Sequence, residues 1–292
     1  MTPSSAELLL PLTLDLGESP IWDAASASLL FVDVTSGTIH RRQGGEVERF
    51  AFGQPVGAAL PTDDGGLVVC ARDGVFLTAA DGSAPVMLAA IEGEDPRNRM
   101  NDAKIDPAGR LWAGTMAFDF APGAAALYRV DGRRVDVVLP GLTISNGMDW
   151  SPDMTLMYFI DSGTYRVDVM DFDAASGAVS DRRLFRALPE SSGMPDGLTV
   201  DAEGGVWVAY FGAGVVRRFD AEGVWDHTVE VDAPQVTSCC FGGADLDELF
   251  ITSGRYGMTD AEIAEHPLSG SVFSVRPGVR GRAAATPFRV AS

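Results

Sequence analysis

Four residues with strong oxygen-donor side chains stand at the same position in a recurring sequence pattern. Each lies five residues before a polar turn segment, such as the one that starts at Asp106 and the one that starts at Asp201. Buried carboxylates are costly unless they are paired or bind a cation, so four such donors at one position are not typical of a protein core. The four residues are Glu18, Asn101, Asn146 and Asp196.

These side chains predict a site for a divalent cation. Two carboxylates and two amides offer oxygen ligands and a charge of −2, which suits a hard divalent cation better than a thiolate-binding one. A cation held in this way binds a substrate oxygen and activates water. Asp196 is the better candidate for the general base, because Glu18 lies next to Pro20 in the pattern and is expected to be fixed for ligation.

The alternative is that these residues only make turns. Asn146 and Asp196 are each followed by glycine, and Asn-Gly and Asp-Gly are common turn pairs. Turns that arise independently need not recur at one position in several repeats. The shared position therefore favours a common site.

Other kinds of catalytic site lack their sequence signals. The sequence contains neither Gly-x-Ser-x-Gly nor a Gly-x-x-x-x-Gly-Lys-Ser/Thr loop. Its three histidines lie outside the shared position and are expected at the surface or in loops, and its three cysteines are expected to be buried free thiols. These residues are His40, His227 and His266, and Cys70, Cys239 and Cys240.

Six copies of a strand-and-turn unit must position the site. Short β-branched and aromatic runs alternate with polar turns, which start near residues 23, 62, 106, 151, 201 and 244, a mean spacing of about 44 residues. That length suits a four-stranded blade, so we predict an all-β, six-bladed β-propeller that forms a single domain over residues 1–292. A parallel β-helix is the structural rival, but its coils are much shorter than these repeats.

Three features outside the repeats also carry expectations. A strand within residues 8–16 would complete the last blade, and residues 259–265 are the best candidate helix, ended by Pro267. The arginine-rich C-terminal end alternates with valines, which fits a closing strand and an exposed loop better than a docking tail. Its arginines are Arg276, Arg280, Arg282 and Arg289.

Net charge makes nucleic acids and membranes unlikely partners. The chain has 41 acidic and 22 basic residues, a net charge of −19, so its average surface repels phosphate backbones and anionic lipids. No apolar run approaches the roughly 20 residues of a spanning helix. Residues 1–11 contain no basic region of the kind that begins a signal peptide, and we expect a cytoplasmic protein, monomeric or weakly homo-oligomeric.

Five segments of this sequence, spread in order over nearly the whole chain, carry a family resemblance. They are residues 16–22, 98–110, 144–150, 195–197 and 238–243. They resemble the senescence-marker-protein/gluconolactonase/luciferin-regenerating-enzyme family. The resemblance implies a six-bladed propeller and one divalent metal held by Glu18, Asn146 and Asp196.

The same resemblance implies roles in catalysis and substrate binding. Asp196 is expected to accept and donate the proton, and Arg99 and Asn101 are expected in the substrate pocket. Asp119, which is flanked by Phe118 and Phe120, corresponds to a further substrate-binding acid.

Family members hydrolyse sugar lactones, so the implied reaction opens an aldono-lactone to the aldonic acid. The expected partner is thus a small sugar lactone, and the metal is calcium, zinc, manganese, magnesium or ferrous iron. Two alternatives stay open. One is an organophosphate or other ester hydrolase on the same metal site, and the other is a non-catalytic propeller whose metal is structural.

Overall fold

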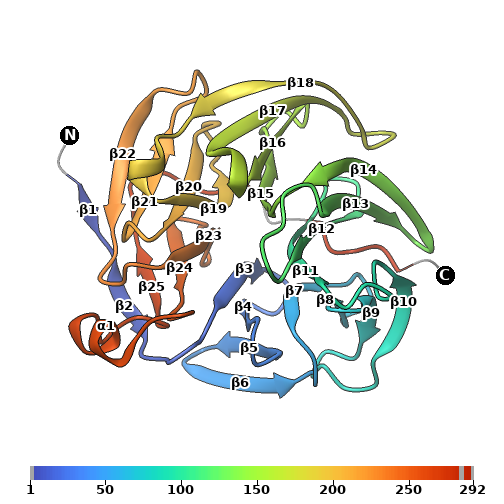
Figure 1. Ribbon diagram of the computed structural model, residues 1–292, viewed down its shortest axis with the longest axis horizontal. Coiled ribbons are helices and arrows are strands. Elements are labelled where there is room, and N and C mark those ends of the chain that lie inside the picture. Colours follow the sequence, from blue (N-terminus) through green and yellow to red (C-terminus); the bar gives the residue numbers. More distant parts are fainter. Residues whose placement is uncertain (1–2, 283–285, 291–292) are drawn as a thin grey trace.

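The chain forms a ring of six antiparallel sheets, or blades, arranged around a central channel (Figure 1). The structure is a computed structural model and describes residues 3–282 and 286–290. The predicted all-β, six-bladed propeller is confirmed. The described residues contain one α-helix, α1, and two 3₁₀ turns, η1 (Ser162–Thr164) and η2 (Glu190–Ser192).

One strand from each blade faces the channel, and these six inner strands pack against one another around the axis. They are β3 (Gly17–Asp23), β7 (Val56–Pro61), β11 (Asn98–Ile105), β15 (Ser145–Trp150), β19 (Met194–Val200) and β23 (Val236–Gly242).

The other strands follow outward in chain order within each blade. Blades 1 to 3 add β4 (Ser28–Asp33), β5 (Thr38–Gln43), β6 (Glu46–Ala51), β8 (Leu67–Ala71), β9 (Gly74–Thr78), β10 (Val86–Ala90), β12 (Leu111–Ala117), β13 (Ala125–Asp131) and β14 (Arg134–Leu142). Blades 4 to 6 add β16 (Leu156–Asp161), β17 (Arg166–Asp173), β18 (Ala178–Ala187), β20 (Val206–Phe211), β21 (Val215–Phe219), β22 (Trp225–Glu230), β24 (Glu248–Ser253) and β25 (Val272–Val275).

The N-terminal segment closes the ring. β2 (Glu7–Leu10) pairs antiparallel with β25, with Leu8 opposite Phe273, and so becomes the outer strand of blade 6. The expected N-terminal strand is confirmed, although it ends at Leu10. A short strand that the sequence did not predict, β1 (Ser4–Ser5), adds to blade 5 by parallel pairing with β22.

The predicted helix is also confirmed, as α1 (Asp260–Glu265), which lies between β24 and β25. Thr259 caps it: its hydroxyl accepts from the Glu262 backbone N–H, and the Glu262 carboxylate accepts from the Thr259 N–H at 2.7 Å. This reciprocal capping box satisfies amide groups that the first helical turn leaves free.

The recurring turn has a buried aspartate as its anchor. The Asp106 carboxylate accepts from backbone N–H groups of its own turn and from the Trp112 indole at 3.0 Å, and it pairs with Arg110 at 2.6 Å. Asp201 repeats this pattern in blade 5, with the Trp207 indole at 2.8 Å. The repeat is therefore visible in the sequence because each carboxylate holds both the turn and the next strand.

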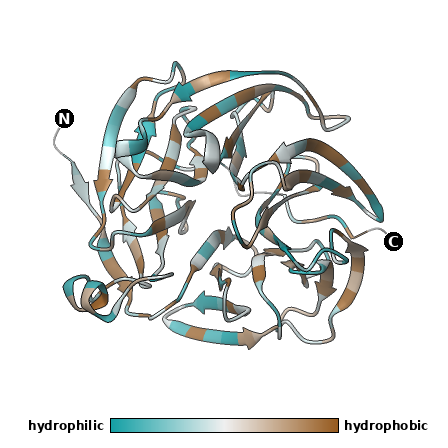
Figure 2. Cartoon of the chain, in the orientation of Figure 1, coloured by the Kyte–Doolittle hydropathy of each residue, from teal (hydrophilic) through white to brown (hydrophobic). Residues whose placement is uncertain are grey.

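The core lies between the faces of neighbouring blades. Trp112, Trp150 and Trp207 are completely buried, and the first two meet edge to face with ring centroids 5.9 Å apart. Outer strands such as β6 and β18 carry both hydrophilic and hydrophobic residues (Figure 2) and are largely exposed, as expected where one side of a strand meets solvent.

Cysteine and histidine positions give one confirmation and one correction. The three cysteines are buried and free, as predicted. The expectation of surface or loop histidines is wrong for His40, which lies in β5, buried and stacked on Phe31 with ring centroids 4.9 Å apart. The flat apolar face of the imidazole fills core space there, and burial lowers the pKa of His40 to about 4.

After β25, residues 276–282 and 286–290, here called the strap, contact turns at one end of the ring. Backbone bridges join Gly281 to Asp201 of blade 5 and Phe288 to Thr62 of blade 2. The strap contacts the turns that follow the inner strands, whereas Glu18 and Asp196 lie near the starts of theirs. These contacts therefore lie at the end of the inner strands away from the predicted site.

An ion-pair cluster joins the strap to two inner strands, β11 and β15. Arg282 contacts the buried Asp149 carboxylate, which also accepts from Lys104 at 3.1 Å. Burial alone would raise the pKa of Asp149, but Arg282, Lys104 and two backbone N–H groups outweigh it and lower the pKa below the ordinary value. The closing strand expected for the arginine-rich end is wrong, because β25 ends at Val275, before the first of its arginines. The described residues that follow are bound to blades 2 and 5 by isolated backbone bridges.

Candidate functional site

A β-bulge in each inner strand produces the shared position of the predicted donors. In all six blades the pairing of the inner strand with its neighbour shifts register at this point, for example between Glu18 and Ile21 and between Pro195 and Leu198. A bulge turns the side chain at the shift away from the regular pleat. The donors therefore project toward the channel instead of into the blades.

The glycines beside the donors serve close packing. Gly147 and Gly197 lie inside β15 and β19, so the alternative that these pairs make turns is wrong. A Cβ on Gly197 would lie 2.1 Å from the Ser238 hydroxyl oxygen, and one on Gly147 would lie 2.5 Å from the Leu198 nitrogen. Neighbouring inner strands approach too closely at the axis for any side chain there.

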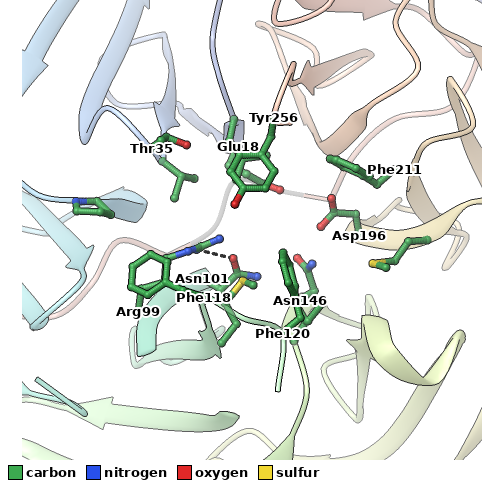
Figure 3. Close-up of a pocket in the computed structure, with 16 residues that line it drawn as sticks. Glu18, Thr35, Arg99, Asn101, Phe118, Phe120, Asn146, Asp196, Phe211 and Tyr256 are labelled. Carbon is green, nitrogen blue, oxygen red and sulfur yellow. Dashed lines mark hydrogen bonds between the residues drawn. The ribbon is translucent and has the colours of Figure 1, made fainter. Parts of the chain in front are cut away.

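The donors border a cavity of about 430 Å³ at one mouth of the channel (Figure 3). Five of the six residues predicted for the site line this cavity, namely Glu18, Arg99, Asn101, Asn146 and Asp196. Its walls are mainly apolar and come from strand ends and from loops within and between the blades. The wall residues include Val34, Pro55, Met116, Phe118, Phe120, Ile144, Met194, Phe211 and Tyr256.

Glu18 and Asp196 are two buried carboxylates that face the same space. Burial raises the pKa of Glu18 well above its ordinary value, and the negative charges of Asp196 and Asp102 raise it further. Burial likewise raises the pKa of Asp196, with Asp102 adding to the effect. Arg99 opposes both shifts, but one guanidinium does not compensate three carboxylates. The site therefore favours additional positive charge.

Asn146 supplies a test of whether a cation fits. Its Nδ2 donates to the Ser162 hydroxyl at 3.1 Å, which directs the amide. Its Oδ1 is buried and has no hydrogen-bond partner among the described residues. A buried carbonyl oxygen without a partner is costly, and beside two carboxylates it is the ligand type that a hard cation takes.

The candidate metal ligands are of two chemical kinds, carboxylate and amide. No three His, Cys, Asp or Glu side chains converge on one point in the part of the chain that the structure describes. The site combines two carboxylates, Glu18 and Asp196, with the amide oxygen of Asn146. This combination leaves coordination positions for water or a substrate, because calcium and similar cations take six or more oxygen ligands.

Arg99 and Asn101 are joined to each other on the opposite wall. Arg99 Nη1 donates to the Asn101 Oδ1 at 2.8 Å and to the Met100 carbonyl at 3.0 Å, and Asn101 Nδ2 donates to the Ser145 carbonyl at 2.9 Å. Burial lowers the pKa of Arg99 to about 10, while Glu18, Tyr256 and Asp196 oppose that shift. The guanidinium is thus held charged and oriented at the cavity.

The structure does not bring Asp119 to the cavity. Its side chain is exposed, and its Oδ1 accepts from the Ala121 N–H at 3.1 Å within the same loop. The flanking Phe118 and Phe120 line the cavity instead. Phe118 and Asp119 lie in a turn that is closed by a hydrogen bond from the Phe120 N–H to the Ala117 carbonyl at 3.0 Å, and this turn places the two rings at the cavity and leaves the acid in solvent.

Sequence reasoning missed the aromatic walls, for which Phe118 and Phe120 beside Asp119 were the available signal. The structure also places Asp102, one residue past the shared position, close to the site, where it accepts from the Ser19 hydroxyl at 3.2 Å and adds negative charge. Burial raises the pKa of Asp102, although Lys104 opposes this.

Comparison with known proteins adds relatives that share the whole fold. The family model described as "SMP-30/Gluconolactonase/LRE-like region" matches residues 16–255. Regucalcin of Bos taurus is 38% identical over 277 residues, covering 91% of this chain and 92% of that protein. Regucalcin of Homo sapiens is 36% identical over 291 residues, covering 96% of this chain and 97% of that protein.

Solved structures agree with this match. A calcium-binding protein, regucalcin, from Agrobacterium tumefaciens superposes with a TM-score of 0.95 at 30% identity, covering 99% of this chain and 98% of that one. A luciferin-regenerating enzyme superposes with a TM-score of 0.89 at 32% identity, covering 98% and 99%. A gluconolactonase from Xanthomonas campestris, at 23% identity and a TM-score of 0.72, shares the fold over 92% of this chain and 88% of that one.

Proposed function

Because this chain belongs to the SMP-30/gluconolactonase/LRE-like family, we propose that it is a metal-dependent hydrolase that opens a sugar (aldono-) lactone to the aldonic acid. At the level of the family, a lactonase-type hydrolase is supported. The observation that carries the finer proposal is the unpartnered amide oxygen of Asn146 beside two buried carboxylates at the base of an open cavity.

Glu18, Asn146 and Asp196 would hold the cation. A divalent cation supplies Lewis-acid chemistry at such a site: it polarises a carbonyl, offsets developing negative charge and lowers the pKa of water. A calcium-binding regucalcin among the structural relatives supports a divalent ion of this kind. The raised pKa values of the two carboxylates support it as well, since a bound cation would favour their ionised forms and offset the cost of burying them.

The protein's own residues would then orient the lactone and move the proton. Arg99 donates hydrogen bonds to the lactone oxygens from the wall opposite the carboxylates, and Asn101 holds the guanidinium in place. Asp196 accepts a proton from water as the water oxygen adds to the carbonyl carbon. The ring carbon–oxygen bond then breaks, and Asp196 returns the proton to the departing ring oxygen.

The test is metal removal followed by refilling. The chelated protein is reloaded separately with calcium, magnesium, manganese, zinc or ferrous ion and offered a panel of aldono-lactones, with acid release followed by a pH indicator. We expect hydrolysis to vanish with chelation and to return with at least one metal. Persistent hydrolysis in excess chelator, with an unchanged circular dichroism spectrum, would contradict the metal dependence.

The same assay separates the alternatives. A phosphate triester or phosphofluoridate hydrolysed faster than every lactone would favour the organophosphate hydrolase. Metal binding without turnover of any ester would favour a structural metal in a non-catalytic propeller.

A further inference from the structure

The mouth of the cavity is built from aromatic side chains that remain exposed to solvent. Phe118, Phe120 and Tyr256 are 43%, 47% and 42% exposed, and all three border the cavity. Figure 3 shows these rings and that of Phe211 around the polar groups at the base. Single exposed apolar residues are common, but several around one cavity mark a binding surface.

The loop between β12 and β13 is shaped to present two of these rings. Phe120 has a φ of +58°, a left-handed conformation that is uncommon for a bulky residue. Its N–H donates to the Ala117 carbonyl at 3.0 Å, and the Phe118 N–H donates to the Arg97 carbonyl at 2.8 Å. A strained residue whose ring faces a cavity is typical of a functional position.

The polar groups of the cavity are few and lie together at its base. Arg99 and Asn101 already bond to each other and to backbone carbonyls, and Asn146 donates to Ser162. Along the walls, hydroxyl groups come from Thr35 and Tyr256, and the remaining wall side chains are largely apolar.

This distribution of polar and apolar groups determines which substituents a substrate can have at the end far from its carbonyl. When the lactone carbonyl lies at the polar base, the ring carbons away from it lie against Phe118, Phe120 and Phe211. A fully hydroxylated aldono-lactone would bury hydroxyl groups there with few partners, which costs free energy. An apolar group at that end would instead gain contact with the rings.

We propose that the preferred substrate is a lactone whose end far from the carbonyl is apolar: a methyl or longer alkyl group replaces the hydroxymethyl group of an ordinary aldono-lactone. This rests on the proposed lactonase function and names its substrate class. The reaction balances as hydrolysis: the water oxygen bonds to the carbonyl carbon, the ring ester bond breaks and the ring oxygen takes a proton. The product is a deoxy- or alkyl-substituted hydroxy acid.

Matched pairs of lactones test the substrate class. Each pair has one ring stereochemistry and differs only in a terminal methyl against a hydroxymethyl group: 6-deoxy-glucono- against glucono-lactone, rhamnono- against mannono-lactone, and fucono- against galactono-lactone. We expect kcat/KM to favour the deoxy member by about 10- to 100-fold in the pairs that are turned over. Lengthening the methyl to an alkyl chain should add roughly fourfold per buried methylene.

Variants of the loop between β12 and β13 test which side chains cause the preference for deoxy lactones. Phe120→Asn keeps a residue that tolerates the left-handed backbone but removes the ring, and Phe118→Ser removes the neighbouring ring. Both should bring the ratio of kcat/KM within each pair down toward one. Leu184→Ser, which removes an exposed apolar side chain from the outer strand β18, is the matched control and should leave the ratio unchanged.

Binding provides a readout that does not depend on turnover. Lactam analogues of one matched pair, in which nitrogen replaces the ring oxygen and resists hydrolysis, are titrated by calorimetry, and the deoxy lactam should bind about tenfold more tightly. Equal or faster turnover of the hydroxymethyl lactones, with equal lactam affinities, would overturn this inference and leave the lactonase function standing. Hydrolysis of no lactone by the metal-loaded protein would overturn both.

Discussion

Asp196 holds two functions in the proposed site, as a ligand of the cation and as the group that takes the proton from water. Its carboxylate is buried, and burial together with Asp102 raises its pKa above the ordinary value. A bound cation would favour the ionised carboxylate, which is the form that accepts a proton. Glu18 borders the same cavity. The metal-binding role and the base role of Asp196 must therefore be separated by substituting one residue at a time.

Asp196→Asn makes that separation, because it keeps an oxygen ligand and nearly the same volume while removing the charge. We expect metal affinity to fall moderately and kcat to fall by roughly 10²- to 10⁴-fold, the contribution usual for a general base. Saturating metal should leave the rate low in a metal-titrated steady-state assay. Recovery of full activity at high metal concentration would make Asp196 a ligand alone and direct the search for the base to Glu18 or Asp102.

Asn146→Ala and Asn101→Ala should have different effects. The Asn146 Oδ1 is unpartnered and available to a cation, whereas Asn101 bonds to Arg99 and the Ser145 carbonyl. Calorimetric titration with metal should therefore show at least a tenfold weaker affinity for Asn146→Ala and little change for Asn101→Ala, whose KM should rise instead. An equal loss of metal affinity in both variants would place Asn101 among the ligands.

At the scale of elements, the inner strands explain both what sequence reasoning reached and what it missed. The repeat was predictable because buried aspartates such as Asp106 and Asp201 tie each turn to the next strand. The convergence of Glu18, Asn146 and Asp196 on one cavity followed from their common place in that repeat.

The remaining features depend on geometry that residue types do not encode. The bulges arise from the crowding of six strands around a narrow axis, and they are visible only as register shifts. The place of Asp119 outside the cavity depends on the local conformation of a loop, including the left-handed backbone at Phe120, and residue types do not encode it. Its role in substrate binding stays a prediction.

His40 in β5 should make stability depend on pH. Its pKa is lowered to about 4 in the folded protein, against an ordinary value near 6.5, so the unfolded chain binds its proton first as pH falls. This contribution to the free energy of unfolding is fully present above pH 6.5. It is lost progressively as pH falls toward 4, by about 1–3 kcal/mol.

His40→Gln should flatten that dependence. Urea unfolding at several pH values between 7 and 5 measures the slope, and His266→Gln, at the C-terminal end of α1, is the control with the wild-type slope. An unchanged slope in His40→Gln would show that other groups cause the acid sensitivity.

At the scale of the whole molecule, we expect the ring and the strap to determine stability and the proposed cation to serve chemistry. The core is distributed over the contacts of six blades, so one axial ion would contribute a small part of the stability. The described residues include no helix long and apolar enough to span a membrane. The expectations of a lactone partner and of a monomer or weak oligomer stay predictions.

Chelation should leave the protein folded at 25 °C. A ligand at 100 times its Kd stabilises the native state by about 2.7 kcal/mol, so we expect removal of the metal to lower Tm by several degrees. Scanning calorimetry with and without chelator measures the shift. Loss of the folding transition on chelation would mean that the propeller depends on the metal.

Arg282→Ala tests the strap. Removing this arginine leaves the buried Asp149 carboxylate with Lys104 as its remaining cationic partner, which should reduce the free energy of unfolding by about 2–4 kcal/mol. Arg280→Ala, two residues earlier at an exposed position, should change it by less than about 0.5 kcal/mol. Equal unfolding midpoints in urea for the two variants would show that the strap adds little stability.

The pairing of β2 with β25 also sets the order in which the molecule can be made. Leu8 leaves the ribosome about 265 residues before Phe273, its partner in the last blade. At a synthesis rate of 5 to 20 residues per second, β2 is made roughly 13 to 53 s before β25, the strand with which it pairs. Until then the nascent chain is expected to be an open arc of blades whose free edges can pair with other chains, and the ring closes only after β25 has been made.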